Sequence, residues 1–160
     1  SIESVKNQVK SGSDCFQLFE TYSGIITNEE YKNFILPLST KILLEARESG
    51  VPTIFFPKNF NEGLKYINKE MCDYVSVDYD ISLDHARNLL DSEVGIQGNM
   101  DPKIFYQEID EIENYLKSLI DFGSKNTDWI FNLGHGFRPD IDHIKVKYVV
   151  EWIKNANWKR

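Results

Sequence analysis

A histidine between two glycines is the first feature of this sequence that could carry chemistry. The stretch I-F-N-L-G-H-G-F-R, residues 130–138, leads from apolar residues straight to His135. This pattern is typical of a strand that is buried from Ile130 onward. The carboxyl end of such a strand is where ligands of α/β folds bind, and His135 would be presented there. Gly134 and Gly136 would allow a sharp turn or a close approach. The imidazole could donate a hydrogen bond, carry charge or bind a metal, or it could be an ordinary loop histidine.

Polar side chains follow other predicted strands as well. Asp78 and Asp80 in V-D-Y-D could form an acid/base or metal pair, but we prefer a structural aspartate and a helix cap. Ser82 is the alternative cap for the same helix. Asn99 and Asp101 likewise indicate a turn and a cap. A lone lysine such as Lys58 is more often solvated or in an ion pair, so we leave it out of the predicted site.

Composition limits the classes of function. The 160 residues are 41% hydrophobic and 13% aromatic, which suits one packed domain. A net charge of -7 without a Lys/Arg run argues against nucleic acid and anionic membranes as partners. Without a membrane-length apolar stretch or a signal peptide, we expect a soluble, cytoplasmic protein. Cys15 and Cys72 lack C-x-x-C spacing and are predicted to be buried free thiols.

The apolar periodicity predicts five strands, each followed by a helix. The expected strands are residues 14–20, 51–57, 74–79, 94–97 and 129–133. Helices are expected near residues 2–9, at 27–48 with a kink at Pro37, and at 61–68, 84–90, 109–123 and 144–153. The last of these is predicted to bury Ile144, Tyr148, Val149, Trp152 and Ile153 on one face. Thr27 and Glu30 form a capping box, and Asp101 with Pro102 begins a helical turn. Because Ser1 is not a methionine, we expect the true start to lie upstream.

Strands that are apolar on both faces, alternating with helices, predict a parallel sheet covered by helices. Two architectures fit: an open doubly wound sheet, or part of a (β/α)8 barrel, which takes roughly 250 residues. This chain is too short to close a barrel. No G-x-G-x-x-G follows the first strand, which argues against a dinucleotide fold.

Four segments, in this order, resemble the uroporphyrinogen decarboxylase family. They are Q-L-F-E-T-Y-S-G (17–24), I-F-F-P-K (54–58), Q-G-N-M-D-P (97–102) and N-L-G-H-G-F-R-P (132–139). The resemblance covers only the family's C-terminal half. It implies that residues 1–160 are a single partial domain, the last five βα units of a (β/α)8 TIM barrel that is incomplete in this chain.

The resemblance also implies an activity. Members of the family are lyases without a cofactor or metal, which remove carbon dioxide from four acetate side chains of uroporphyrinogen III to give coproporphyrinogen III in heme biosynthesis. A pyrrole carbon is protonated, and an aspartate stabilises the positive ring while carbon dioxide leaves. That aspartate and the substrate-binding arginines belong to the missing half. We therefore assign no catalytic residue here, expect the chain alone to be inactive, and expect a homodimer at full length.

Two positions carry over from the family as substrate-binding residues. His135 matches the histidine that contacts the substrate, and Thr21 stands where the family usually has serine in F-[DE]-S-x-x-G. Threonine keeps the hydroxyl, although a turn residue bonding its own backbone is the alternative. An octacarboxylate needs more cations than the strand-end loops offer, and Arg138, like Lys58, is left out of the predicted site.

Three other interpretations remain open. Related methyltransferases hold zinc with H-x-C, but the residues two places after His85, His135 and His143 are Arg, Phe and Lys, which disfavours that class. A barrel could instead bind phosphate at the glycine-rich loops around Gly98 and residues 134–136. A non-catalytic half-barrel could also pair with itself through its open strand edges.

Overall fold

Five parallel strands form one sheet in a computed structural model that describes residues 2–158. The strands pair in chain order, without the reversal that defines a doubly wound sheet, so the predicted barrel-type fold class is confirmed. They are β1 (Phe16–Glu20), β2 (Thr53–Pro57), β3 (Tyr74–Ser76), β4 (Gly95–Gln97) and β5 (Trp129–Ile130). The α-helices are α1 (Ile2–Lys10), α2 (Asn28–Glu30), α3 (Leu36–Glu48), α4 (Leu83–Leu89), α5 (Ile109–Ser118), α6 (Ile120–Lys125) and α7 (His143–Asn155).

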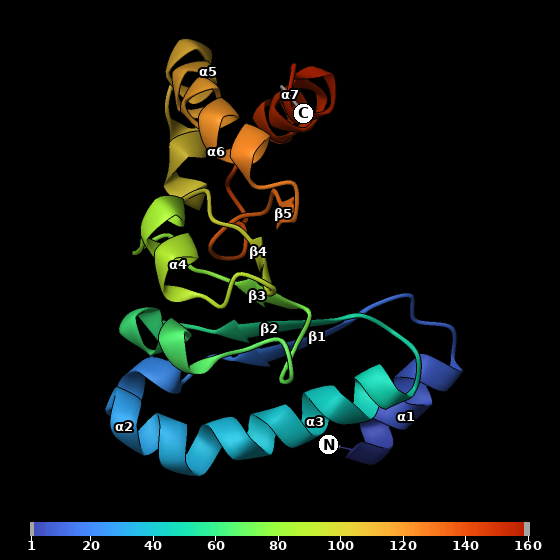
Figure 1. Cartoon of the computed structure of the whole chain (residues 1–160). Helices are drawn as coiled ribbons and strands as arrows, with labels where there is room; N and C mark the ends of the chain where they lie inside the picture. The colour runs from blue at the N-terminus through green and yellow to red at the C-terminus, as the bar shows by residue number, and fades with distance from the viewer. Residues whose placement is uncertain (1, 159–160) are drawn as a thin grey trace.

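The sheet is strongly curved. The side-chain amide Nε2 of Gln97 on β4 lies 3.5 Å from Oε1 of Gln17 on β1, although β2 and β3 run between these strands. In a flat sheet the two strands would be about 14 Å apart, at about 4.8 Å per strand. Figure 1 shows the sheet turning from β1 to β5, with α1 and α3 below it, α4 to the left and α5, α6 and α7 above it. This is the wall of an open barrel.

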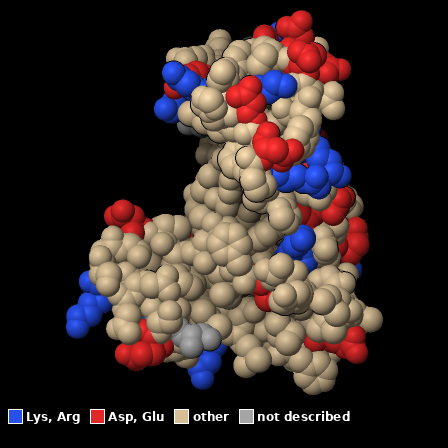
Figure 2. All heavy atoms as spheres, turned by 180° about the vertical axis from the view of Figure 1, so that it is seen from behind, with Lys and Arg blue, Asp and Glu red and all other residues tan. Residues whose placement is uncertain are grey.

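The two faces of the sheet differ in how they are covered. The outer face packs on the helices and buries Phe55 and Ile96 completely. The inner face, which includes Phe19 and Ile130, leaves these side chains 64% and 37% exposed. The prediction that Ile130 is buried is therefore wrong, because β5 is an edge strand and its inner face has no cover within residues 2–158. Figure 2 shows a hollow on the side without helices, walled mainly by uncharged residues.

Two predicted helices are interrupted. The capping box of Thr27 and Glu30 is confirmed, but a π-helical turn over Tyr31–Ile35 separates α2 from α3. Pro37 lies in the first turn of α3, where a missing backbone N–H costs nothing, so the break precedes the proline. The other interrupted helix is the one predicted at 109–123. It is divided into α5 and α6, which meet at Leu119, and α6 continues past Gly123.

Short 3-10 helices replace two other predicted helical segments. They span Asn61–Tyr66 and Pro102–Tyr106, the latter capped by the Asp101 side chain as predicted, and a third covers Ser23–Ile25.

Some residues predicted to be buried are exposed. Ile144, the second residue of α7, is 63% exposed, because nothing among residues 2–158 packs over this end of the helix. Val149 is buried, and Tyr148, Trp152 and Ile153 pack partly buried against the core. Cys15 is exposed, whereas Cys72 is buried as predicted, and burial raises its thiol pKa to about 12. Both cysteines are free, as predicted. No helix within residues 2–158 has the length and apolar character needed to cross a membrane.

We predict that Ile112→Ala on α5 lowers the free energy of unfolding by about 2–5 kcal/mol, because Ile112 is fully buried and its loss leaves a cavity. The same substitution at the exposed Ile144 is the matched control and should cost less than about 0.5 kcal/mol. Urea unfolding followed by circular dichroism measures both. Equal losses would contradict the packing described here.

Candidate functional site

The loops at the carboxyl edge of the sheet are fastened by a buried carboxylate. Asp78, which follows β3, is 3% exposed. Its Oδ2 accepts a hydrogen bond from the backbone N–H of Asn59 in the β2 loop at 2.6 Å, and its Oδ1 accepts one from Asp80 N–H at 3.0 Å. The preferred interpretation of Asp78 as structural is thus supported by its contacts. Asp80 is exposed, and Ser82 rather than Asp80 caps α4.

The fastening continues through the loops after β4 and β5. The buried side-chain amide of Asn99 donates to the carbonyl oxygens of Asp78 at 2.8 Å and Ile81 at 2.5 Å. Gly134 N–H donates to the Met100 carbonyl oxygen at 3.0 Å. A Cβ at Gly134 would lie 2.4 Å from Tyr79 N, so this glycine is required by the close approach of the β3 loop. Gly136, by contrast, has open space around it.

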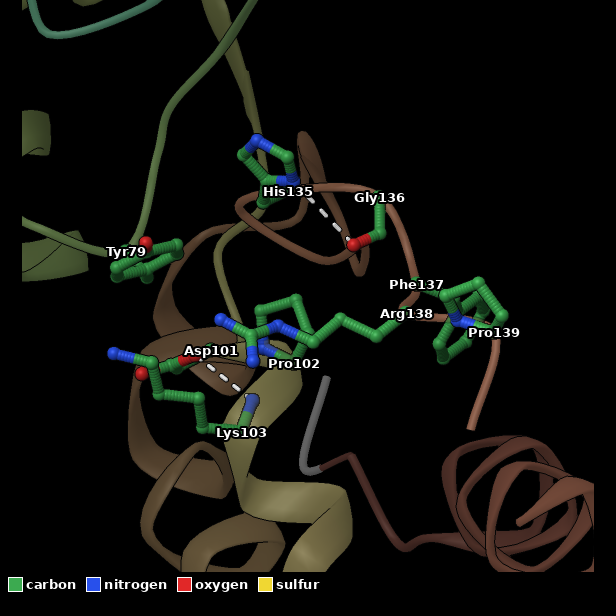
Figure 3. A pocket seen from close by; sticks show the side chains of 9 residues that line it. All are labelled: Tyr79, Asp101, Pro102, Lys103, His135, Gly136, Phe137, Arg138 and Pro139. Carbon is green, nitrogen blue, oxygen red and sulfur yellow. Dashed lines mark hydrogen bonds between the residues drawn. The ribbon is translucent and has the colours of Figure 1, made fainter. Parts of the chain in front are cut away.

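His135 lies between two cavities at this edge. One, of about 260 Å³, opens on the inner face of the sheet and is lined by Phe19, Phe56 and Asn132 together with residues 133–137. The other, of about 240 Å³, lies among the loops after β3, β4 and β5 (Figure 3). The ring of His135 is exposed, and its Nδ1 lies 3.4 Å from the Gly136 carbonyl oxygen, a long hydrogen bond. The imidazole is therefore accessible from both cavities.

Thr21 occupies a different position from His135. It is exposed in the turn after β1 and lines neither of the two cavities beside His135. Two residues later, the buried Ser23 hydroxyl donates to backbone carbonyls of Glu20 and Lys58 and so fixes this turn to the β2 loop. The structure thus brings His135 to a cavity and leaves Thr21 at the rim.

The second cavity contains residues that the sequence did not single out. Lys103 and Tyr79 line it together with Arg138, which had been set aside (Figure 3). Lys103 directly follows the Q-G-N-M-D-P segment but is not part of it, so only its proximity to the β5 loop identifies it. Among residues 2–158, no group of three His, Cys, Asp or Glu side chains could hold a metal ion.

A comparison with sequence models of protein families shows which family the chain belongs to. The sequence model of the family described as uroporphyrinogen decarboxylase (URO-D) matches residues 1–156. The chain belongs to this family. Three relatives named uroporphyrinogen decarboxylase are 36% identical (Francisella philomiragia), 32% (Vesicomyosocius okutanii) and 29% (Geobacter sulfurreducens). These matches cover 92%, 93% and 99% of the chain but only 44%, 44% and 46% of the relatives.

The chain thus spans less than half the length of these URO-D relatives. A solved methyltransferase from Methanosarcina mazei superposes with a TM-score of 0.73 over 94% of the chain and 44% of its own length. At 16% sequence identity this likeness shows the fold alone. The partial coverage agrees with the open, five-stranded sheet.

We predict that Asp78→Asn destabilises the chain by about 1–3 kcal/mol. The asparagine NH2 group would face one of the two backbone N–H donors, leaving that buried donor without an acceptor. Asp80→Asn removes the same charge from an exposed side chain and is the matched control. Denaturant unfolding compares them, and equal midpoints for the two variants would show that Asp78 does not fasten the loops.

Proposed function

We propose that this chain forms the C-terminal half of the substrate cleft of a uroporphyrinogen decarboxylase. The complete enzyme converts uroporphyrinogen III into coproporphyrinogen III by removing carbon dioxide from four acetate side chains. The observation that carries the proposal is the position of His135, in the family's N-L-G-H-G motif, at the mouth of the cavity on the inner sheet face.

The inner cavity suits a pyrrole ring. Phe19 and Phe56, whose ring centroids are 5.9 Å apart, provide apolar surface, and Asn132 provides a polar group beside His135. Pyrrole rings present flat aromatic faces, whereas their acetate and propionate substituents are charged. A site that combines an aromatic wall with a hydrogen-bonding rim matches both parts.

His135 and Thr21 are proposed to bind substrate carboxylates rather than to move protons. In each turnover a CH2–COO⁻ group takes up one proton and becomes CH3 with release of CO2. The resemblance assigns the stabilising aspartate and the substrate-binding arginines to the half of the barrel that this chain lacks. On that basis residues 1–160 hold the substrate but do not decarboxylate it alone.

Several expectations remain predictions. These are the cytoplasmic location, the homodimer, and the absence of a cofactor and of a nucleic-acid partner.

The decisive experiment is a chimera in which residues 1–160 replace the corresponding C-terminal part of the Francisella philomiragia relative, which is 36% identical. We predict that the chimera produces coproporphyrinogen, measured by chromatography of the oxidised porphyrins. The chain alone and the relative's N-terminal part alone, the two controls, should produce none. A folded chimera without activity would refute the proposed function, and activity of the chain alone would refute the division between halves.

In the same chimera, His135→Gln should raise KM for uroporphyrinogen III about tenfold, because the amide does not reproduce the position and direction of the imidazole N–H that is proposed to bind a substrate carboxylate. Stability should not change, since His135 is exposed and its hydrogen bond to the Gly136 carbonyl oxygen is long. His143→Gln is the matched control, because its side chain is 93% exposed at the start of α7. An unchanged KM for His135→Gln would remove this residue from the site.

A further inference from the structure

The cavity between the β3, β4 and β5 loops concentrates positive charge on a chain whose net charge is -7. Lys103 and Arg138 both line it, and neither has an ion-pair partner within 4.0 Å among the described residues. Figure 3 shows the Arg138 side chain reaching across the cavity above Pro102 toward Tyr79 and Lys103. Lys103 Nζ lies 5.9 Å from the centre of the Tyr79 ring.

Two carboxylates near these cations have other partners. Asp101 Oδ1 accepts the backbone N–H of Lys103 at 2.9 Å and so caps the 3-10 helix. Asp140 Oδ1 accepts the Tyr106 hydroxyl at 2.8 Å. This hydrogen bond raises the pKa of Tyr106, and the nearby Arg138 opposes part of the rise. The cavity lining itself carries two cations and one anion, so it has a net positive charge before any contribution from His135.

The β5 loop that carries Arg138 is packed against the 3-10 helix that carries Lys103. Phe137, next to Arg138, packs its ring edge-on against Phe105, with the centroids 5.3 Å apart, and Phe105 is buried. The Gly134–Met100 hydrogen bond fixes the start of the same loop. A cavity of about 240 Å³ can hold a carboxylate with a short carbon stem, since a water takes about 30 Å³.

We propose that Lys103 and Arg138 form a carboxylate-binding subsite. The ligand follows from the proposed function: the subsite holds one acidic side chain of the porphyrinogen, and a pyrrole ring of the same molecule occupies the adjoining inner cavity. His135 lies at the boundary, because residues 135–137 line both cavities. Arg138 can bind the carboxylate with two parallel N–H donors, and Lys103 adds a point charge.

The subsite is first tested on the chain itself, without the enzymatic reaction. Propionate is titrated into ¹⁵N-labelled chain while the Nε–Hε signal of Arg138, assigned by its absence from Arg138→Gln, is followed by NMR. We expect a saturable shift with propionate and none with propionamide, which lacks the charge. Lys103→Gln should weaken propionate binding about tenfold. Lys147→Gln, an exposed α7 variant with the same charge change, should bind like the original chain. The absence of a saturable shift, or equal binding by Lys103→Gln, would overturn the subsite.

The assignment to the substrate is tested in the chimera. Arg138→Gln should raise KM for uroporphyrinogen III about tenfold and leave kcat within about twofold, while Lys147→Gln changes neither. An active chimera whose KM does not respond to Arg138→Gln would overturn this assignment and leave the proposed decarboxylase function intact. An inactive chimera would refute the decarboxylase function, whereas the propionate titration decides the subsite independently.

Discussion

The buried carboxylate of Asp78 is the contact on which the carboxyl edge of this sheet depends. The two carboxylate oxygens accept hydrogen bonds from the backbone N–H groups of Asn59 and Asp80. The backbone carbonyl oxygen of Asp78 accepts one from the side-chain amide of Asn99. A carboxylate can accept from two separate directions, which no neutral side chain of this size does equally well. Loops after β2, β3 and β4 are thereby fixed to one another, and the β5 loop with His135 docks on them at Gly134.

The curvature of the sheet determines what those loops can enclose. Since Gln17 and Gln97 meet across two intervening strands, the inner face is concave and its aromatic side chains point toward a shared space. The exposed Phe19 and Ile130 have no cover among residues 2–158. Burying such side chains stabilises a protein by about 1.5–3 kcal/mol each, so their exposure favours association of this face with another surface. A substrate ring and the other half of a barrel can both supply that cover.

The sequence predicted local features well because they depend on neighbouring residues. The capping box at Thr27 and Glu30, the cap at Asp101 and the five strands follow from spacing alone. Burial was predicted less well at Ile130, Ile144 and Cys15, because exposure depends on what packs opposite a residue, and the periodicity of one segment does not report that. Lys103 was missed for the same reason. It meets Arg138 only because β4 and β5 are adjacent strands.

The anchoring of the β5 loop has a consequence for binding rates. The loop is pinned by Gly134 at its start and by the Phe105–Phe137 contact near Arg138. Its backbone loses little entropy when a ligand arrives, and only the side-chain torsions of Arg138 and Lys103 must be ordered. Differences among anionic ligands at this cavity should therefore appear in how long each one stays bound rather than in how fast it arrives.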